Sequence, residues 1–314
     1  MKTLAFLAAI LASAFSAAAD LVNVEELWSH LFTNGPVVWQ ASSNDLPENL
    51  WIYKKLPRVF SATTISNAII LASFQDKGVS QPSTNQITIW GDHFEGEPDP
   101  PCFLILPNVG QISFTLGDRR PDSPEGTATN QAAVKRAWNC LAQLGLDRSQ
   151  FVKTNDASSG GFGVFIPRQI DGIQVYGGSE GFQIWFDEQR VLQFCLLLPN
   201  LERDNQSQVA SPQEIIHCIR AHKAIVLPGV DEENYFARLK SLAGAKKLTI
   251  TKITPYYGEG VFGEVPTNDV PPEFVIPLAE LEAVADFGNS NANVKLLSPI
   301  LSSEVIRLLK SKTK

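Results

Sequence analysis

The segment from Gly177 to Gly181 has the spacing of a hydrolase nucleophile. Its Gly-x-Ser-x-Gly order places Ser179 where a sharp turn from a strand into a helix would expose a catalytic serine. The residues that follow, however, alternate apolar and polar side chains, which is the period of a strand and not of a helix. The sequence therefore predicts a hairpin turn at this point and no nucleophile.

Two groups of side chains have the chemistry of metal ligands. Cys218 and His222 lie four residues apart on an expected helix, but His217 points elsewhere and no second ligand pair accompanies them. The loop from Asp92 to Asp99 contains four carboxylates and a histidine, and its spacing differs from that of a calcium-binding EF-hand loop. We interpret the first group as a packed helix face and the second as a solvated loop, so the sequence predicts no metal site.

No other motif predicts a catalytic or cofactor-binding residue. The glycine-rich run from Ser158 to Gly163 precedes a strand, so it cannot present a helix N-terminus to a phosphate group. The 33 acidic residues make accidental carboxylate pairs common, and the geometry that a glycosidase needs is invisible in a sequence. A hydrolase with dispersed carboxylates therefore stays open as an alternative.

These residues lie in a chain where amphipathic helices alternate with groups of short strands. The first helix should include Ile65 and Ala72 on its apolar face, with Ser61 or Thr63 as its N-cap. Strands are expected at 86–90, 102–106 and 111–116, and a linker at 117–126. The second helix should begin after Thr129 and end at Gly145, followed by strands at 164–167, 173–176, 181–187 and 190–198.

The third group begins with a strong helix start signal. Ser211 as N-cap, Pro212 in the first turn and Glu214 as the capping-box partner predict a helix. A short helix after Asp231 should follow, then strands at 248–253, 273–278 and 294–297 and a final helix at 302–309. One more helix is expected at 24–32, near the start of the chain.

This order predicts an α+β fold of repeated helix plus antiparallel meander units, with the helices packed on one face of the sheets. The expected divisions are a signal peptide at 1–19, an N-terminal module at 20–125, a central module at 126–205 and a C-terminal module at 206–314. A single irregular α+β domain is the alternative.

The first 19 residues have the features of a secretory signal. Lys2 precedes an apolar run that ends in the Ala-x-Ala pattern of Ala17 and Ala19, and that run is too short to span a bilayer. The sequence thus predicts a secreted protein with no membrane span. A net charge of −7 without a basic block argues against nucleic-acid binding.

Secretion would allow two covalent modifications, which are disulfides between the cysteines and glycosylation of an asparagine. An even number of cysteines in an exported chain is compatible with up to two disulfides, in any of three pairings, or with buried free thiols. Asn205 begins the sequence Asn-Gln-Ser, a glycosylation motif that we expect in a polar loop. The cysteines are Cys102, Cys140, Cys195 and Cys218.

The central segment resembles a known family. The stretches 165–177 and 182–191, with Arg168, the Gly172-Ile-x-Val strand and the acidic turn at Asp187, resemble the PepSY/FTP class of modules. The layout of the chain is similar to that of extracytoplasmic proteins of the YycH/YycI type. This resemblance implies a binding, inhibitory or regulatory module, and it transfers no catalytic residue.

We therefore expect a secreted, non-enzymatic binding or regulatory protein that engages a peptide or protein partner, by addition of a strand to an exposed sheet edge. The alternatives are a secreted hydrolase that uses a pair of carboxylates and a structural surface protein. No cofactor is expected.

Overall fold

The computed structural model describes residues 35–42, 46–73, 86–91, 101–116, 130–153, 163–176, 180–186, 190–221, 224–227, 244–259, 261–262, 265–266 and 273–311. Several expected features lie outside these residues. They are the signal peptide, the helices at 24–32 and after Asp231, the linker at 117–126, the N-cap Thr129, Ser179, His222 and the loop from Asp92 to Asp99.

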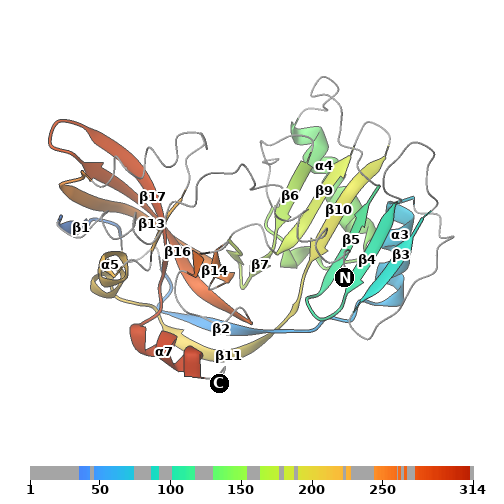
Figure 1. Cartoon of the computed structure of the whole chain (residues 1–314), viewed down its shortest axis with the longest axis horizontal. Helices are drawn as coiled ribbons and strands as arrows, with labels where there is room; N and C mark the ends of the chain where they lie inside the picture. Colours follow the sequence, from blue (N-terminus) through green and yellow to red (C-terminus); the bar gives the residue numbers. More distant parts are fainter. Residues whose placement is uncertain are drawn as a thin grey trace.

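The first large sheet is fully antiparallel and has six strands in the order β3-β4-β5-β10-β9-β6. Helices α3 (Ala62–Leu71) and α4 (Asn130–Gln143) contact each other and cover one face of it (Figure 1). The strands are β3 (Ile87–Trp90), β4 (Cys102–Leu106), β5 (Gln111–Thr115), β6 (Gly163–Pro167), β9 (Gly181–Phe186) and β10 (Val191–Leu197).

The core of this half lies between the sheet and the two helices. Phe194 of β10 is fully buried, and its ring contacts those of Phe103, Phe114 and Phe182 at centroid distances of 6.0–6.2 Å. Strands β5, β9 and β10 alternate buried and partly exposed side chains along most of their length, so the second face of these strands is not part of this core.

The second large sheet has seven strands and is mixed. Its main order is β1-β13-β16-β17-β12, while β2 pairs with both β16 and β11. The strand β1 is parallel to β13, and the other pairs are antiparallel. The strands are β1 (Val37–Trp39), β2 (Asn49–Leu56), β11 (Asn200–Gln208), β12 (Ile225–Val226), β13 (Lys247–Glu259), β16 (Phe274–Asp286) and β17 (Asn291–Pro299).

Both faces of the second sheet are covered near the start of β16. Residues Val275 and Ala279 belong to a core that includes Ile215 of helix α5 (Pro212–Arg220). Phe274 and Ile276 belong to a core on the other face, together with Ile306 of helix α7 (Ser303–Ser311). This half of β16 is therefore buried on both sides.

Short elements and a pair of long strands connect the two sheets. Strands β2 and β11 run side by side from one sheet toward the other (Figure 1). The hairpin of β7 (Gln169–Ile170) and β8 (Ile173–Gln174) follows β6, and Val175 after it pairs with Tyr257 of β13. A small ribbon of β14 (Val261–Phe262) and β15 (Val265–Pro266) and the 3₁₀ turn η3 (Arg148–Gln150) complete the described elements.

The predicted layout of repeated helix-plus-meander units with helices on one face of the sheets is wrong. Strands dominate the structure, and they form two large sheets of different topology in place of a series of similar units. The six-stranded sheet joins strands from both sides of the boundary predicted between residues 125 and 126. The physical reason is that pairing between distant strands, which periodicity cannot show, determines how the local elements combine.

Local signals nevertheless predicted several elements correctly. Ser61 caps α3, with its Oγ accepting a hydrogen bond from the Thr64 amide at 3.0 Å. The predicted capping box of α5 is confirmed, since the Ser211 amide donates to Glu214 Oε2 at 2.8 Å and the Glu214 amide to Ser211 Oγ at 3.4 Å. Gly145 after α4 has a φ of 72°, which suits the residue that ends a helix.

Candidate functional site

A pocket lies beside α4, between this helix and the turn that follows it. Val134, Ala137 and Leu141 are buried in the core, and Val134 also lines the pocket. The heptad-like spacing leaves Lys135 exposed and Trp138 partly buried at the boundary. Helix α4 thus places an indole ring and a cation next to each other at the edge of the core.

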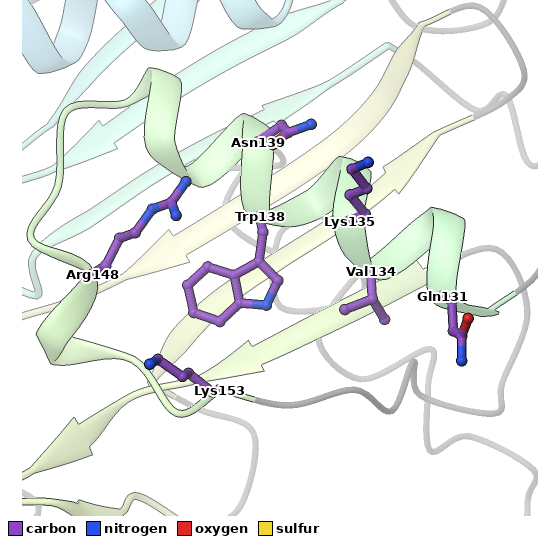
Figure 2. Close-up of a pocket in the computed structure, with 7 residues that line it drawn as sticks. All are labelled: Gln131, Val134, Lys135, Trp138, Asn139, Arg148 and Lys153. Atoms are coloured by element: carbon purple, nitrogen blue, oxygen red, sulfur yellow. The ribbon is translucent and has the colours of Figure 1, made fainter.

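This α4 groove has a volume of about 600 Å³ and is open to solvent. Figure 2 shows the indole of Trp138 in the middle of the groove, with Arg148 and Lys153 to one side and Gln131 of α4 to the other. Lys135 and Asn139 come from the same helix as Trp138. The groove therefore combines an aromatic surface with cationic and amide side chains.

All the charged side chains that line the α4 groove are cationic. Its lining includes Lys135, Arg148 and Lys153 and no carboxylate. The Arg148 guanidinium lies 6.0 Å from the centre of the Trp138 ring, at the outer limit of a cation–π contact. Within the described part of the chain no carboxylate pairs with Lys135 or Lys153, so their charges are available to an anionic ligand.

The turn after α4 forms the side of the groove that carries Arg148 and Lys153. Asp147 caps η3, with its carboxylate accepting from the Ser149 amide at 2.9 Å and from the Ser149 hydroxyl at 2.7 Å. These hydrogen bonds lower the pKa of Asp147, so it is ionised at neutral pH. The Gln169 amide donates to the Ser149 carbonyl at 2.7 Å and Phe151 is fully buried, which anchors the turn that carries Arg148.

A second cluster of charged side chains lies where the two sheets meet, and its geometry is structural. Arg168 Nη1 lies 2.6 Å from Glu180 Oε2, and both side chains are almost completely buried. Lys55 of β2 approaches the other carboxylate oxygen of Glu180 to 3.5 Å. This cluster ties the end of β6 to β2, and none of its three side chains lines the α4 groove.

Beside this cluster, a more exposed network covers the β7–β8 hairpin. The Tyr53 hydroxyl donates to the Asp171 carboxylate, which also pairs with Arg203 at 3.4 Å. Burial, followed by the hydrogen bond to Asp171, raises the pKa of Tyr53. The Arg203 guanidinium lies 5.1 Å from the centre of the Trp51 ring. An exposed ion pair contributes little stability, so we assign this network to the positioning of the hairpin.

All four cysteines are free in the structure. Cys102 of β4 and Cys195 of β10 both lie beside β5, opposite Thr115 and Ser113 respectively. One intervening strand separates neighbours by roughly 10 Å, which exceeds the reach of a disulfide. Cys140 of α4 belongs to the core of the six-stranded sheet. Cys218 is buried on α5, whose Ile215 and Ile219 belong to a core of the seven-stranded sheet.

The other predicted site residues are dispersed. Asn205 is exposed, but it lies in strand β11 next to a bulge and not in the expected polar loop. Cys218 is buried and His217 is exposed on α5, while His222, which was considered as a second ligand beside Cys218, lies outside the described residues. Residues 181–186 after the Gly-x-Ser-x-Gly motif form β9, as expected for a hairpin.

Neither a metal site nor a membrane helix is found within the described ranges. No three side chains of His, Cys, Asp or Glu converge there in the manner of metal ligands. None of the helices there has both the length and the apolar character needed to cross a bilayer.

Sequence reasoning missed most of the α4 groove. It predicted the helix that carries Lys135 and Trp138, but it gave no role to Arg148 or Lys153. Their contribution depends on how the turn folds back beside α4, which no local pattern encodes. The signal available in the sequence was Trp138 next to cationic Lys135 on an expected helix.

Comparison with known proteins gives no family for this chain. No protein-family model matches the sequence, and no curated protein is significantly similar to it. The resemblance of the central segment to PepSY/FTP modules therefore stays a prediction.

Proposed function

We propose that this chain is a secreted, non-enzymatic binding protein, and that its α4 groove binds an acidic segment of a peptide or protein partner. The observation that supports the proposal is the combination of Trp138 with three cations and no carboxylate in one open groove of about 600 Å³. The signal peptide predicted at 1–19 would deliver the chain to an extracellular partner.

The chemistry of the groove suits an acidic peptide with an apolar or aromatic residue. Arg148, Lys135 and Lys153 are spread around Trp138, so they can pair with carboxylates on both sides of a side chain that packs on the indole. Gln131 and Asn139 supply amide groups that can bond to a peptide backbone. The overall charge of −7 disfavours a long polyanion such as a nucleic acid, which the whole chain would repel.

The sheet edges are a less suitable place for the partner. Strand β11 is the longest edge strand of the described sheets, and its exposed Glu202, Arg203 and Asp204 resist pairing with another strand. The edge strands β3, β6 and β12 have only 4, 5 and 2 residues. The groove, which needs no strand addition, is thus the better candidate.

The α4 groove also offers no support to the alternative of a hydrolase with paired carboxylates. Such an enzyme needs one carboxyl group as an acid and another as a base or nucleophile in the same pocket. The groove lining has neither, since its charged residues are all cations.

The proposal is tested with a fluorescein-labelled peptide of glutamate and tyrosine, titrated with the full-length protein and followed by fluorescence anisotropy. We expect saturable binding that weakens as salt is added, because exposed charges are screened. Trp138→Ala and Lys153→Glu should each weaken binding by about tenfold, which corresponds to ~1.4 kcal/mol.

Two controls make the result specific. Lys54→Glu changes the charge of an exposed lysine on β2 that does not line the groove, and it should leave the affinity unchanged. A peptide of lysine and tyrosine with the same length should not bind. Equal binding of both peptides, or affinity that is insensitive to Trp138→Ala and Lys153→Glu in folded protein, would refute the assignment of the groove.

A further inference from the structure

The face of the six-stranded sheet that turns away from α3 and α4 has an ordered set of side chains. The pairing register places Trp185, Gln193 and Thr115 in one row across β9, β10 and β5. The adjacent row contains Gln183, Cys195 and Ser113 on the same strands. We call these two rows the open face, because the side chains in both are partly exposed while their neighbours along each strand are buried.

The open face is polar but uncharged. None of the residues in its two rows carries a charge. The residues that continue the rows on β6 and β4 are also uncharged: Gly163 and Cys102 in the first row, and Phe165 and the buried Leu104 in the second. The side-chain amides of Gln183 and Gln193 make no hydrogen bond to any described residue, although both are half-buried. An amide at such a site presents two donors and an acceptor whose partners must come from a ligand or from solvent.

Trp185 lies beside these amides in a fixed position. It pairs directly with Gly163 of the edge strand β6. A Cβ at Gly163 would lie 2.5 Å from Trp185 Nε1 and 2.9 Å from Cδ1, so the indole occupies the space of the missing side chain. An aromatic ring packed over a glycine of an edge strand is held without the entropy cost of ordering it on binding.

From this juxtaposition we propose that the open face binds a neutral oligosaccharide. The indole of Trp185 packs against the apolar C–H face of a pyranose ring, and the amides of Gln183 and Gln193 bond to its hydroxyl groups. A sugar ring combines a flat apolar face with a rim of neutral donors and acceptors, and the open face offers the matching groups in adjacent rows. The absence of charged side chains in these rows selects a neutral glycan over an acidic one.

This site is distinct from the α4 groove. Helix α4 covers the opposite face of the same sheet, and the groove chemistry is cationic while that of the open face is neutral. The proposal therefore does not depend on the proposed function. A protein with both sites would be retained on a glycan while its α4 groove binds a partner.

The experiment is isothermal titration calorimetry of the full-length protein with cellohexaose, laminarihexaose, xylohexaose and chitohexaose, each in the same buffer, and with oligogalacturonate as an acidic comparison. We expect at least one neutral oligosaccharide to bind, and oligogalacturonate to bind more weakly. Trp185→Ala should abolish binding, while Gln183→Ala and Gln193→Ala should each weaken it by about two- to tenfold, the effect of one hydrogen bond.

Trp138→Ala is the matched control, since it removes a tryptophan from the other face of the sheet and should leave oligosaccharide affinity unchanged. Binding of the Glu/Tyr peptide should in turn survive Trp185→Ala. Three results would overturn the proposal: no neutral oligosaccharide binds, oligogalacturonate binds most tightly, or light scattering shows a dimer that Trp185→Ala dissociates.

Discussion

Arg168 and Glu180 form an ion pair of 2.6 Å between side chains that are 8% and 0% exposed, at the junction of the two sheets. Arg168 lies at the end of β6 and Glu180 immediately before β9, and Lys55 of β2 completes the cluster. The Arg168 amide also donates to the Glu180 carbonyl at 3.1 Å. The pair thus joins neighbouring strands by both main chain and side chain, in a place that water does not reach.

This pair should be sensitive to the loss of one partner. Glu180→Ala leaves a buried guanidinium without its counter-charge, and we expect the free energy of unfolding to fall by about 3–5 kcal/mol. The double variant Arg168→Met/Glu180→Leu should recover most of that loss, because it leaves no unpaired charge. Urea denaturation followed by circular dichroism measures all three proteins.

The control for this prediction is an exposed pair. Lys252 and Glu282 lie 2.8 Å apart on the surface of β13 and β16. Lys252→Ala should change the denaturation midpoint little, since solvent and salt screen exposed pairs. An effect of Lys252→Ala as large as that of Glu180→Ala would contradict the distinction between buried and exposed pairs.

The thiols give a test of the fold itself. The structure has four free cysteines, so protein purified without reductant and unfolded in guanidinium should react with four equivalents of Ellman's reagent. Before unfolding the reaction should be slow, because burial raises the pKa of Cys102 and Cys195 to about 11 and suppresses the reactive thiolate. A count of two or zero in the unfolded protein would show disulfides that this fold does not contain.

The same burial predicts a loss of stability at alkaline pH. The pKa of Cys195 is raised from 9.0 to about 11, with desolvation as the cause. The unfolded chain therefore releases this proton near pH 9 while the folded chain keeps it, and the stabilisation present below pH 9 is lost as the pH rises toward 11. Between about pH 8 and about pH 10.5, wild type should lose roughly 2 kcal/mol more than Cys195→Ala.

Urea denaturation of both proteins at the two pH values measures this difference. Other groups titrate in the same range, but they are common to the two proteins and cancel in the comparison. A pH dependence that is identical in wild type and Cys195→Ala would mean that the thiol is fully hydrated in the folded protein.

The sequence predicted the elements whose signals are local. Strand β4, bounded by turn residues, was predicted at Cys102–Leu106 as it is found, and Ser211 with Glu214 marked the start of α5. These signals depend only on neighbours a few residues away. Their combination into two sheets of different topology depends on distant pairing, which is why the repeated-unit layout failed.

The long strands show where local propensity was overridden. Strand β16 continues from Leu278 through residues 279–286, whose sequence Ala-Glu-Leu-Glu-Ala-Val-Ala-Asp has the composition of a helix. It forms a strand because β13 and β17 pair with it on both sides. Strand β13 likewise extends through Pro255, a residue that usually breaks a sheet.

In the α4 groove and on the open face, sequence periodicity predicts which residues share one side of a helix or strand. It does not predict which helices and strands lie next to each other. The alternation predicted after Gly181 is confirmed, and it places Gln183 and Trp185 on one side of β9. It could not predict that β10 and β5 lie next to β9 and place Gln193 and Thr115 in the same row. Register between strands is set by the whole fold and not by one strand.

Gly163 offers a test that links the fold to the open face. Replacing a glycine in a strand with alanine usually stabilises it, by about 0.5–1 kcal/mol. Here the new Cβ would lie 2.5 Å from Trp185 Nε1, so the indole must move and the usual gain should disappear or reverse. In Gly163→Ala the near-ultraviolet circular dichroism of the tryptophans should change, and the affinity for the neutral oligosaccharide should fall while that for the Glu/Tyr peptide does not. A variant that is more stable than wild type with an unchanged tryptophan signal would show that the indole does not pack on Gly163, and the preorganisation argued for Trp185 would then be lost.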